Sequence, residues 1–302
     1  MALDRYLEHL AYEKRCSAHT VQAYRRDLEQ FGTWLQAMGV GLEAATGKLV
    51  RVWMMSLLEQ GIGARSVNRK LSALRGYYTF LRMVGVLAED PTALIEPPKT
   101  PKRLPEFVEQ VRMDRLFDEL KWPDGAKGER DRLILELLYG TGMRLAELLG
   151  LGVGDVDLHR ATLRVLGKRN KERILPLAPA LGDRLRAYLA QRAAGGAPEG
   201  GPLLVDEKGQ PLARRSVQRL VVHYLSGVTS QRKRSPHVLR HTFATHMLEQ
   251  GADLNAVKEL LGHAGLAATQ VYTHNTVEKL RNVHAQAHPR GGGVPHEPSN
   301  DR

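Results

Sequence analysis

Apolar residues in the first part of the chain recur every three to four positions, which is the spacing of amphipathic helices. Four segments show this pattern, at about residues 3–14, 17–38, 48–60 and 64–84. Ser17 has the chemistry of a helix N-cap, and Gly61 and Gly85 stand where glycine commonly ends a helix. The pattern therefore predicts an N-terminal domain of four helices over residues 1–86.

Proline and basic residues are concentrated in the next segment. Its prolines are Pro91, Pro97, Pro98, Pro101 and Pro105. Proline fixes φ and removes a backbone donor, so an extended, semi-rigid linker is expected over residues 87–105. Lys99, Lys102 and Arg103 make this predicted linker basic enough to lie along a polyanion.

The hydrophobic period changes within the second predicted domain, residues 106–288. Helices are expected at about residues 108–120, 129–139, 182–192, 213–225, 235–250, 254–261 and 277–287. Two apolar strands flank the polar turn 167–172, which predicts a β-hairpin with Pro176 on an edge position, and residues 203–205 are a candidate third strand. The Gly- and Pro-rich residues 289–302 are expected to be disordered. The predicted fold is mainly α with a small antiparallel β-sheet.

Composition adds a class of partner to this picture. The chain has 44 Lys and Arg against 33 Asp and Glu, a formal net charge of +11. Such a surplus favours an acidic partner, and nucleic acid is the commonest one in the cytosol. Part of the surplus lies in the fourth predicted helix, whose arginines form either a solvated face or a phosphate-facing surface: Arg65, Arg69, Arg75 and Arg82.

Three features of the sequence bear on the compartment. Cys16 is the only cysteine, so an intrachain disulfide is impossible. No run approaches the roughly 18 apolar residues of a membrane helix. Asp4 and Arg5 stand where a signal peptide would have its apolar stretch. We therefore expect a cytoplasmic protein without membrane insertion.

The first group of residues that could carry chemistry is centred on Arg144. Glycines bracket the turn in front of it, and a new helix is expected to start near Arg144. Free N–H groups at a helix N-terminus suit an anion, so this arginine would be held toward a phosphate. The alternative is a structural pair with Glu147. Lys168, at the start of the hairpin turn, either enters a groove or is simply solvated.

The second group lies near the end of the chain. His237 and Arg240 are three positions apart, so on a helix they share a face and can converge on one ligand. Gly262 is expected to end a helix and to expose His263, and Tyr272 follows nine positions later. His241 and His246 are interpreted as packing or hydrogen-bonding residues.

These residue types do not make a metal site. A zinc site needs a compact set of His, Cys, Asp or Glu, whereas the residue three positions after His237 is Arg240, whose charge repels a cation. A GxxxxGK[ST] loop for a nucleoside triphosphate does not occur either, so we expect neither a metal nor a cofactor. Guanidinium groups can instead hold phosphate oxygens, and nearby positive charge helps a tyrosine, with its usual pKa of about 10, to ionise.

Three motifs closely resemble the signature of tyrosine recombinases, the integrase family: His237-x-x-Arg240, Leu-Leu-Gly-His at 260–263, and Gln-Val-Tyr-Thr-His at 270–274. The resemblance covers nearly the whole chain, since residues 17–28 are similar to the start of the family's helical core-binding domain. It implies a core-binding (SAM-like) domain and an α+β catalytic domain that form a clamp around DNA. The catalytic set that it implies is Arg144, Lys168, His237, Arg240, His263 and Tyr272.

The resemblance also implies the chemistry, which is similar to that of a type IB topoisomerase. Tyr272 would attack the scissile phosphate, forming a 3′-phosphotyrosyl link and releasing a 5′-hydroxyl. The implied roles of the others are phosphate binding by Arg144, Arg240 and His263, protonation of the leaving oxygen by Lys168, and acid–base transfer by His237. The family's turn usually reads Gly-Lys-Gly, and here Arg169 replaces the second glycine.

The compact length and the ending His288-Pro289-Arg290 are similar to the Xer subfamily of chromosome-dimer recombinases. This implies double-stranded DNA with a dif-like site, a second Xer recombinase in a cyclic heterotetramer, and a septal DNA translocase as partners. One alternative is an integrase of a phage, integron or transposon with the same catalytic residues. The other is a non-catalytic DNA-binding protein, which would have no need of Tyr272.

The last predicted helix, residues 277–287, is too short to be stable alone in water. Its apolar stripe consists of Val277, Leu280, Val283 and Ala287. This stripe must be buried, either against the same subunit or, as the resemblance suggests, against the catalytic domain of a neighbour.

Overall fold

The computed structural model describes residues 2–101, 106–167, 171–195, 200–262 and 274–292. The chain divides into two compact units, Met1–Arg103 and Leu104–Arg302. Each unit has a hydrophobic core of its own. None of the helices within the described ranges is long and apolar enough to cross a membrane.

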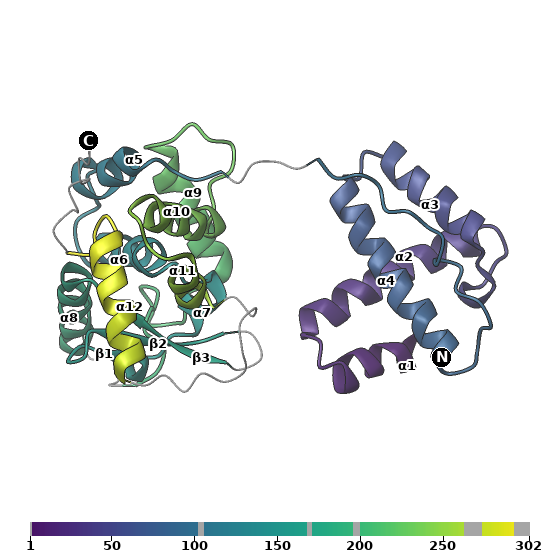
Figure 1. Cartoon of the computed structure of the whole chain (residues 1–302), viewed down its shortest axis with the longest axis horizontal. Coiled ribbons are helices and arrows are strands. Elements are labelled where there is room, and N and C mark those ends of the chain that lie inside the picture. Colours follow the sequence, from purple (N-terminus) through teal and green to yellow (C-terminus); the bar gives the residue numbers. More distant parts are fainter. Residues whose placement is uncertain (1, 102–105, 168–170, 196–199, 263–273, 293–302) are drawn as a thin grey trace, which may run out of the picture. The chain divides into compact units, whose positions relative to one another are not determined.

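The first unit is helical, as predicted (Figure 1). Its helices are α1 (Ala2–Glu8), which continues into a π-helical turn (His9–Glu13), α2 (Ala18–Gln36), α3 (Gly47–Glu59) and α4 (Ala64–Met83). Ser17 is the N-cap of α2, where its side chain accepts a hydrogen bond from the backbone N–H of Thr20. Gly61 and Gly85 have φ of +80° and +75°, the left-handed conformation that favours glycine after a helix.

Part of the predicted linker packs against this unit. Ile95 is 3% exposed and belongs to the core of the unit. Its carbonyl oxygen accepts a hydrogen bond from Nη2 of Arg75, at 2.5 Å, and the carbonyl oxygen of Pro98 accepts one from Nδ2 of Asn68, at 3.0 Å. The proline-rich chain is thus held to α4 as far as Pro98.

Two of the four arginines on α4 have structural partners. Arg69 pairs with the buried carboxylate of Asp27, which also accepts from Nζ of Lys70 at 2.9 Å. Arg75 is engaged with the segment that follows α4. Arg65 and Arg82 are exposed. The basic face expected on this helix is therefore partly a polar network, and Arg65 and Arg82 are its exposed members near the two ends of the helix.

In the second unit a small sheet lies at the edge of a group of helices (Figure 1). Its helices are α5 (Gln110–Asp114), which continues into a π-helical turn (Arg115–Glu119), α6 (Ala126–Thr141), α7 (Leu145–Gly150), α8 (Pro179–Ala194), α9 (Arg214–Ser226), α10 (Pro236–Glu249), α11 (Leu254–Leu261) and α12 (His274–Ala287). α10 contacts α6, α11 and α12, so this helix is central to the unit. Leu239 and Phe243 on α10 are fully buried.

The sheet is antiparallel and has the order β1-β2-β3. Its strands are β1 (Val156–Asp157), β2 (Thr162–Leu166) and β3 (Glu172–Pro176). The predicted hairpin is confirmed, with Leu163 opposite Leu175, and Pro176 lies on the edge strand β3. The expected third strand at 203–205 is wrong. Pro202 and Val205 form only isolated bridges, because the short segment after α7 pairs with β2 in their place.

α12 is buried against its own unit, which is the first of the two alternatives for its apolar stripe. It contacts β3, α10 and α11, and Leu280 and Ala287 are 2% and 3% exposed. His284 and His288 stack at 5.0 Å, and their Nε2 atoms donate to the carbonyl oxygens of Gly140 and Tyr139 at the end of α6. Burial lowers the pKa of both imidazoles.

The packed chain also extends past residue 288. Arg290 donates two hydrogen bonds to the carboxylate of Asp118, at 3.0 and 2.9 Å. Gly291 is buried, and a Cβ there would lie 2.5 Å from the carbonyl oxygen of His284. Residues 289–292, which were predicted as part of a disordered tail, are therefore packed against the unit. The rest of the predicted tail, residues 293–302, lies outside the described part of the chain.

Candidate active site

Half of the predicted catalytic set falls within the described residues. Arg144, His237 and Arg240 are described. Lys168, His263 and Tyr272 lie outside the described residues, as does Arg169 in the hairpin turn. The described part of the site therefore consists of the first three side chains and of the chain ends that lead to the other three.

Arg144 is the N-cap of α7, and the turn before it depends on Gly142. Gly142 ends α6 with φ of +62°, and a Cβ at this position would lie 2.4 Å from Cδ1 of Phe243. Only glycine fits both the conformation and the space. The side chain of Arg144 is 34% exposed, so this guanidinium is held at the surface of the unit and not within its core.

Glu147 holds Arg144 from one turn further along α7. Its carboxylate accepts hydrogen bonds from the backbone N–H of Arg144, at 2.7 Å, and from Nη1 of Arg144, at 2.9 Å. The structural pair considered from the sequence therefore exists. It is compatible with phosphate binding, because a partly exposed guanidinium has further N–H groups. In this arrangement Glu147 orients the arginine.

Arg240 is buried in the middle of α10, only 8% exposed. Its Nη1 donates to the carbonyl oxygen of Gly142, at 2.7 Å, and its Nη2 donates to that of Leu261, at 2.6 Å. Burial, together with the positive charges of Arg144 and Arg173, lowers its pKa to about 10, while Glu147 opposes this shift. Arg240 thus stays charged at neutral pH and joins the turn before Arg144 to the end of α11.

His237 is exposed and lies in the first turn of α10, three positions before Arg240. On a helix this spacing places both on one side, as expected. His246, in contrast, is buried, and its Nδ1 lies 2.8 Å from the hydroxyl oxygen of Tyr139. Burial lowers the pKa of His246. The interpretation of His246 as a hydrogen-bonding residue of the core is confirmed.

Arg173 is a member of this site that the sequence interpretation missed. It is 4% exposed at the start of β3, and its Nη1 and Nη2 both donate to the carboxylate of Glu147, each at 2.8 Å. Its Nε donates to the carbonyl oxygen of Leu260, at 2.9 Å. A signal was available, because Arg173 alternates with buried Leu175 on one face of the strand. A charged residue at an inward position needs a partner.

The charge balance of the site favours an anion. Arg144 and Arg173 donate hydrogen bonds to the carboxylate of Glu147, and Arg240 lies close enough to interact with its charge. Among these described side chains, three guanidinium groups thus stand against one carboxylate. Burial of this carboxylate opposes its ionisation, but hydrogen bonds and charge from Arg173, and then hydrogen bonds from Arg144, lower its pKa to about 2. The carboxylate is therefore ionised at neutral pH, and the site still has an excess of positive charge.

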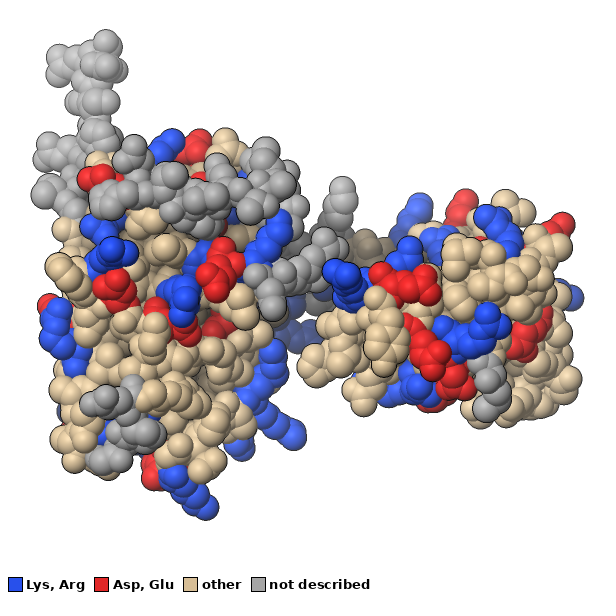
Figure 2. Space-filling view, turned by 90° about the horizontal axis from the view of Figure 1, so that it is seen from below, with Lys and Arg blue, Asp and Glu red and all other residues tan. Residues whose placement is uncertain are grey.

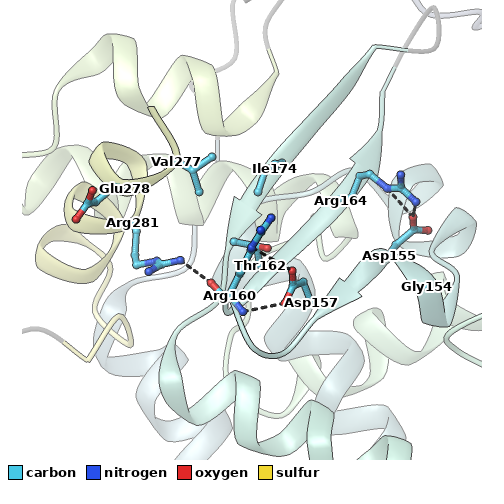
Figure 3. A pocket seen from close by; sticks show the side chains of 10 residues that line it. All are labelled: Gly154, Asp155, Asp157, Arg160, Thr162, Arg164, Ile174, Val277, Glu278 and Arg281. Atoms are coloured by element: carbon cyan, nitrogen blue, oxygen red, sulfur yellow. Dashed lines mark hydrogen bonds and ion pairs between the residues drawn. The ribbon is translucent and has the colours of Figure 1, made fainter. Parts of the chain in front are cut away.

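A cavity of about 630 Å³ lies elsewhere in this unit, between the sheet and the first half of α12 (Figure 3). Several of the charged side chains that line it form ion pairs or hydrogen bonds with other residues of the lining. Arg164 pairs with Asp155 at 3.0 Å, and Nη2 of Arg281 donates to the carbonyl oxygen of Arg160 at 2.5 Å. None of Arg144, His237 and Arg240 lines it, so this cavity is separate from the candidate site.

The two units match two models of the same family. The model of the Phage integrase family matches residues 106–279, and the model of the phage integrase N-terminal SAM-like domain matches residues 3–85. The chain therefore belongs to the phage integrase family, the tyrosine recombinases, and is a site-specific DNA recombinase. The predicted fold class is confirmed as well.

Curated relatives place the chain close to the Xer recombinases. It is 39% identical to tyrosine recombinase XerC of Chlorobaculum tepidum over 95% of this chain and 94% of the relative. It is 38% identical to XerC of Bacillus subtilis, covering 94% and 95%, and 39% identical to XerD of Pseudomonas aeruginosa, covering 96% and 97%. The expected similarity to the Xer subfamily is confirmed. XerC and XerD relatives are equally similar to this chain, so these comparisons do not distinguish between the two.

Solved structures share the fold at lower identity. The Tn1549 transposon integrase in complex with transposon right end DNA has a TM-score of 0.68 at 16% identity, covering 93% of this chain and 98% of that one. The XerH recombinase bound to palindromic difH substrate has a TM-score of 0.67 at 20% identity, covering 94% and 83%.

Proposed function

We propose that this recombinase resolves chromosome dimers at a dif-like site in the cytoplasm during cell division, through a covalent bond between DNA and Tyr272. The observation that carries the chemistry is the convergence of Arg144 and Arg240 on the end of α11. Nη2 of Arg144 donates to the carbonyl oxygen of Gly262, at 3.4 Å, and Nη2 of Arg240 to that of Leu261. In the sequence, His263 follows at once and Tyr272 comes ten positions after Gly262.

The proposed reaction exchanges one ester bond for another. The hydroxyl oxygen of Tyr272 attacks the scissile phosphorus, the bond from phosphorus to the 5′-oxygen breaks, and Lys168 supplies the proton that the leaving oxygen takes. Arg144 and Arg240 hold the non-bridging oxygens with His263, and their planar guanidinium groups stabilise the charge of the transition state. His237 serves in acid–base transfer and accepts the proton that the hydroxyl of Tyr272 loses. Since the phosphotyrosyl link conserves the ester, a 5′-hydroxyl can reverse the steps and rejoin the strand without ATP.

DNA contact is proposed for α9 in the same unit. Its buried side is apolar, with Val217 and Val221 fully buried, and its opposite side exposes Arg215, Gln218 and Arg219. An α-helix with such side chains fits the major groove of B-DNA. In the face of the molecule shown in Figure 2, by comparison, basic and acidic side chains are interspersed on both units.

The double substitution Arg215→Ala and Arg219→Ala is expected to lower the affinity for DNA by about 100-fold, since each such contact contributes roughly 1–3 kcal/mol. At saturating DNA the cleavage rate should change little, because α9 does not carry the candidate active site. Gel-shift titration and single-turnover cleavage measure the two quantities. Arg186→Ala on the exposed side of α8 is the matched control. Unchanged affinity in the double variant would refute the proposed role of α9.

The proposed partners are a second Xer recombinase, in a cyclic heterotetramer, and a septal DNA translocase. The support is by similarity: relatives are named XerC and XerD, and a solved neighbour is XerH bound to difH. The second candidate function is integration of a mobile element. The likeness in fold to the Tn1549 transposon integrase favours it, although at 16% identity.

A resolution assay separates the two functions. The substrate is a plasmid with two directly repeated copies of the host's dif-like sequence, incubated with this protein and the host's second Xer recombinase. We expect two smaller circles, and none when one dif-like copy is scrambled or when the partner carries a substitution of its nucleophile. Resolution without the partner, or recombination of a mobile element's end in preference to the dif-like site, would contradict the proposed role.

The basic side chains of the proposed site imply that cleavage does not require a metal ion. Among the described residues, no group of three or more His, Cys, Asp and Glu side chains could hold one. We expect full cleavage activity to persist in excess EDTA, because Arg144, Arg240 and Lys168 supply the positive charge. Covalent adduct on a nicked substrate is the measurement. Activity that EDTA removes and added Mg²⁺ restores would argue for a metal-dependent nuclease.

A further inference from the structure

Three arginines hold the end of α11, each bound to a different backbone carbonyl. Three consecutive carbonyl oxygens at this end, those of Leu260, Leu261 and Gly262, accept hydrogen bonds from Arg173 at 2.9 Å, Arg240 at 2.6 Å and Arg144 at 3.4 Å. The last carbonyls of a helix have no partner within it, so they accept bonds from outside. Two of the three donors belong to the proposed phosphate site. The third, Arg173, has no role in the proposed mechanism.

Arg173 also helps to fix the position of the Arg144 side chain. Its two Nη atoms donate hydrogen bonds to the two carboxylate oxygens of Glu147, at 2.8 Å each. The same two oxygens accept from the backbone N–H and from Nη1 of Arg144. Glu147 is 5% exposed and therefore has little freedom to move. If Arg173 moved, the carboxylate of Glu147 would move with it, and the guanidinium of Arg144 would be displaced in turn.

The turn after α11 is built around the same side chain. Gly262 has φ of +63°, and a Cβ there would lie 3.1 Å from Nη1 and 3.2 Å from Cδ of Arg173. Arg173 thus fills the space that a side chain at position 262 would need. Its contacts reach both α7, which carries Arg144, and the chain that continues to His263.

We propose that Arg173 is a positioning residue of the recombinase active site: it fixes Glu147, and through it Arg144, against the end of α11. The inference rests on the proposed function of this site. Arg173 itself is only 4% exposed, and three of its N–H groups are committed to Glu147 and Leu260, so it acts through these neighbours and not by contact with DNA. Lysine cannot replace it, because a single ammonium group lacks the planar fork that spans two partners.

The test is Arg173→Lys in single-turnover cleavage of a nicked suicide substrate. We expect the cleavage rate at saturating DNA to fall on the order of 100-fold, the effect of a displacement of about 1 Å in a catalytic group, while the affinity for DNA stays unchanged. Arg184→Lys is the matched control. Arg184 also bridges two carboxylates of this unit, those of Glu129 and Glu136, but none of its partners belongs to the site. The control should cleave at the wild-type rate.

A double-mutant cycle shows whether Arg173 acts through Glu147. Glu147→Gln keeps the shape of the carboxylate and removes its charge, so it should slow cleavage as Arg173→Lys does. The two substitutions together should cost little more than either alone, since they break one link. Circular dichroism establishes that each protein is folded at the assay temperature. If Arg173→Lys does not fold, Glu147→Gln alone carries the test, and wild-type cleavage by it would overturn the inference.

Several results would overturn the proposal. Wild-type cleavage by folded Arg173→Lys would show that the fork is dispensable. A fall in DNA affinity with an unchanged rate, or fully additive effects in the cycle, would show a direct contact with DNA or an independent role. Failure of the proposed function looks different: the wild-type protein itself would then form no covalent adduct, whatever residue stands at position 173.

Discussion

Substitution of Arg240 by lysine is expected to lower the rate of DNA cleavage on the order of 10²–10³-fold, the usual cost of removing one preorganised donor from a charged transition state. The positive charge would remain, but the geometry would not. Arg240 spans from the carbonyl oxygen of Gly142 to that of Leu261 and is 8% exposed. A lysine can satisfy one of these carbonyls at a time, and it has no flat edge for two phosphate oxygens.

Single-turnover cleavage at saturating DNA measures this effect on the chemical step. Arg184→Lys again controls for the loss of a bridging arginine elsewhere in the unit, and thermal unfolding controls for the cost of a buried, imperfectly paired ammonium group. We expect Arg240→Lys to bind DNA nearly as well as the wild type. A cleavage rate within a few-fold of the wild type, in a folded protein, would mean that charge alone suffices and that the planar clamp is the wrong account.

Tyr272→Phe has the largest expected effect, a loss of cleavage on the order of 10⁴-fold or more, as for other substitutions that remove a nucleophile. The ring stays and only the attacking oxygen is lost, so binding to DNA should be nearly unchanged. Tyr12→Phe is the matched control, since Tyr12 is 79% exposed and belongs to the first unit. Cleavage by Tyr272→Phe at the wild-type rate would show that Tyr272 is not the nucleophile.

Much of the fold was predictable because local signals agree with packing. The helices of the first unit follow from apolar spacing, a capping serine and glycines with positive φ. The hairpin follows from alternation around a polar turn. The third strand was misplaced because Val156 and Asp157 are too short a run to show alternation, whereas 203–205 is a conspicuous apolar run that folds as loop. Short segments take their structure from tertiary partners.

In the candidate site, too, some residues could be recognised from local sequence signals and others only from their tertiary contacts. Arg144, His237 and Arg240 stand out by their spacing and by the glycines near them. Arg173 does not, because its importance lies in contacts with Glu147 and Leu260, which are 26 and 87 positions away. Arg69 and Arg75 show the reverse case: they look like a phosphate-binding face in sequence, but they pair with Asp27 and Ile95. Composition cannot distinguish a basic surface from an internal network.

If Tyr272 is the nucleophile, it becomes covalently joined to DNA, and the residue that carries the adduct can be mapped. The protein is incubated with a nicked suicide substrate, the trapped complex is digested with nuclease and trypsin, and the nucleotide-bearing peptide is sequenced by mass spectrometry. We expect the nucleotide on the tryptic peptide covering residues 259–279, attached to Tyr272 through a 3′-phosphate. An adduct at any other residue, or one that persists in Tyr272→Phe, would contradict it.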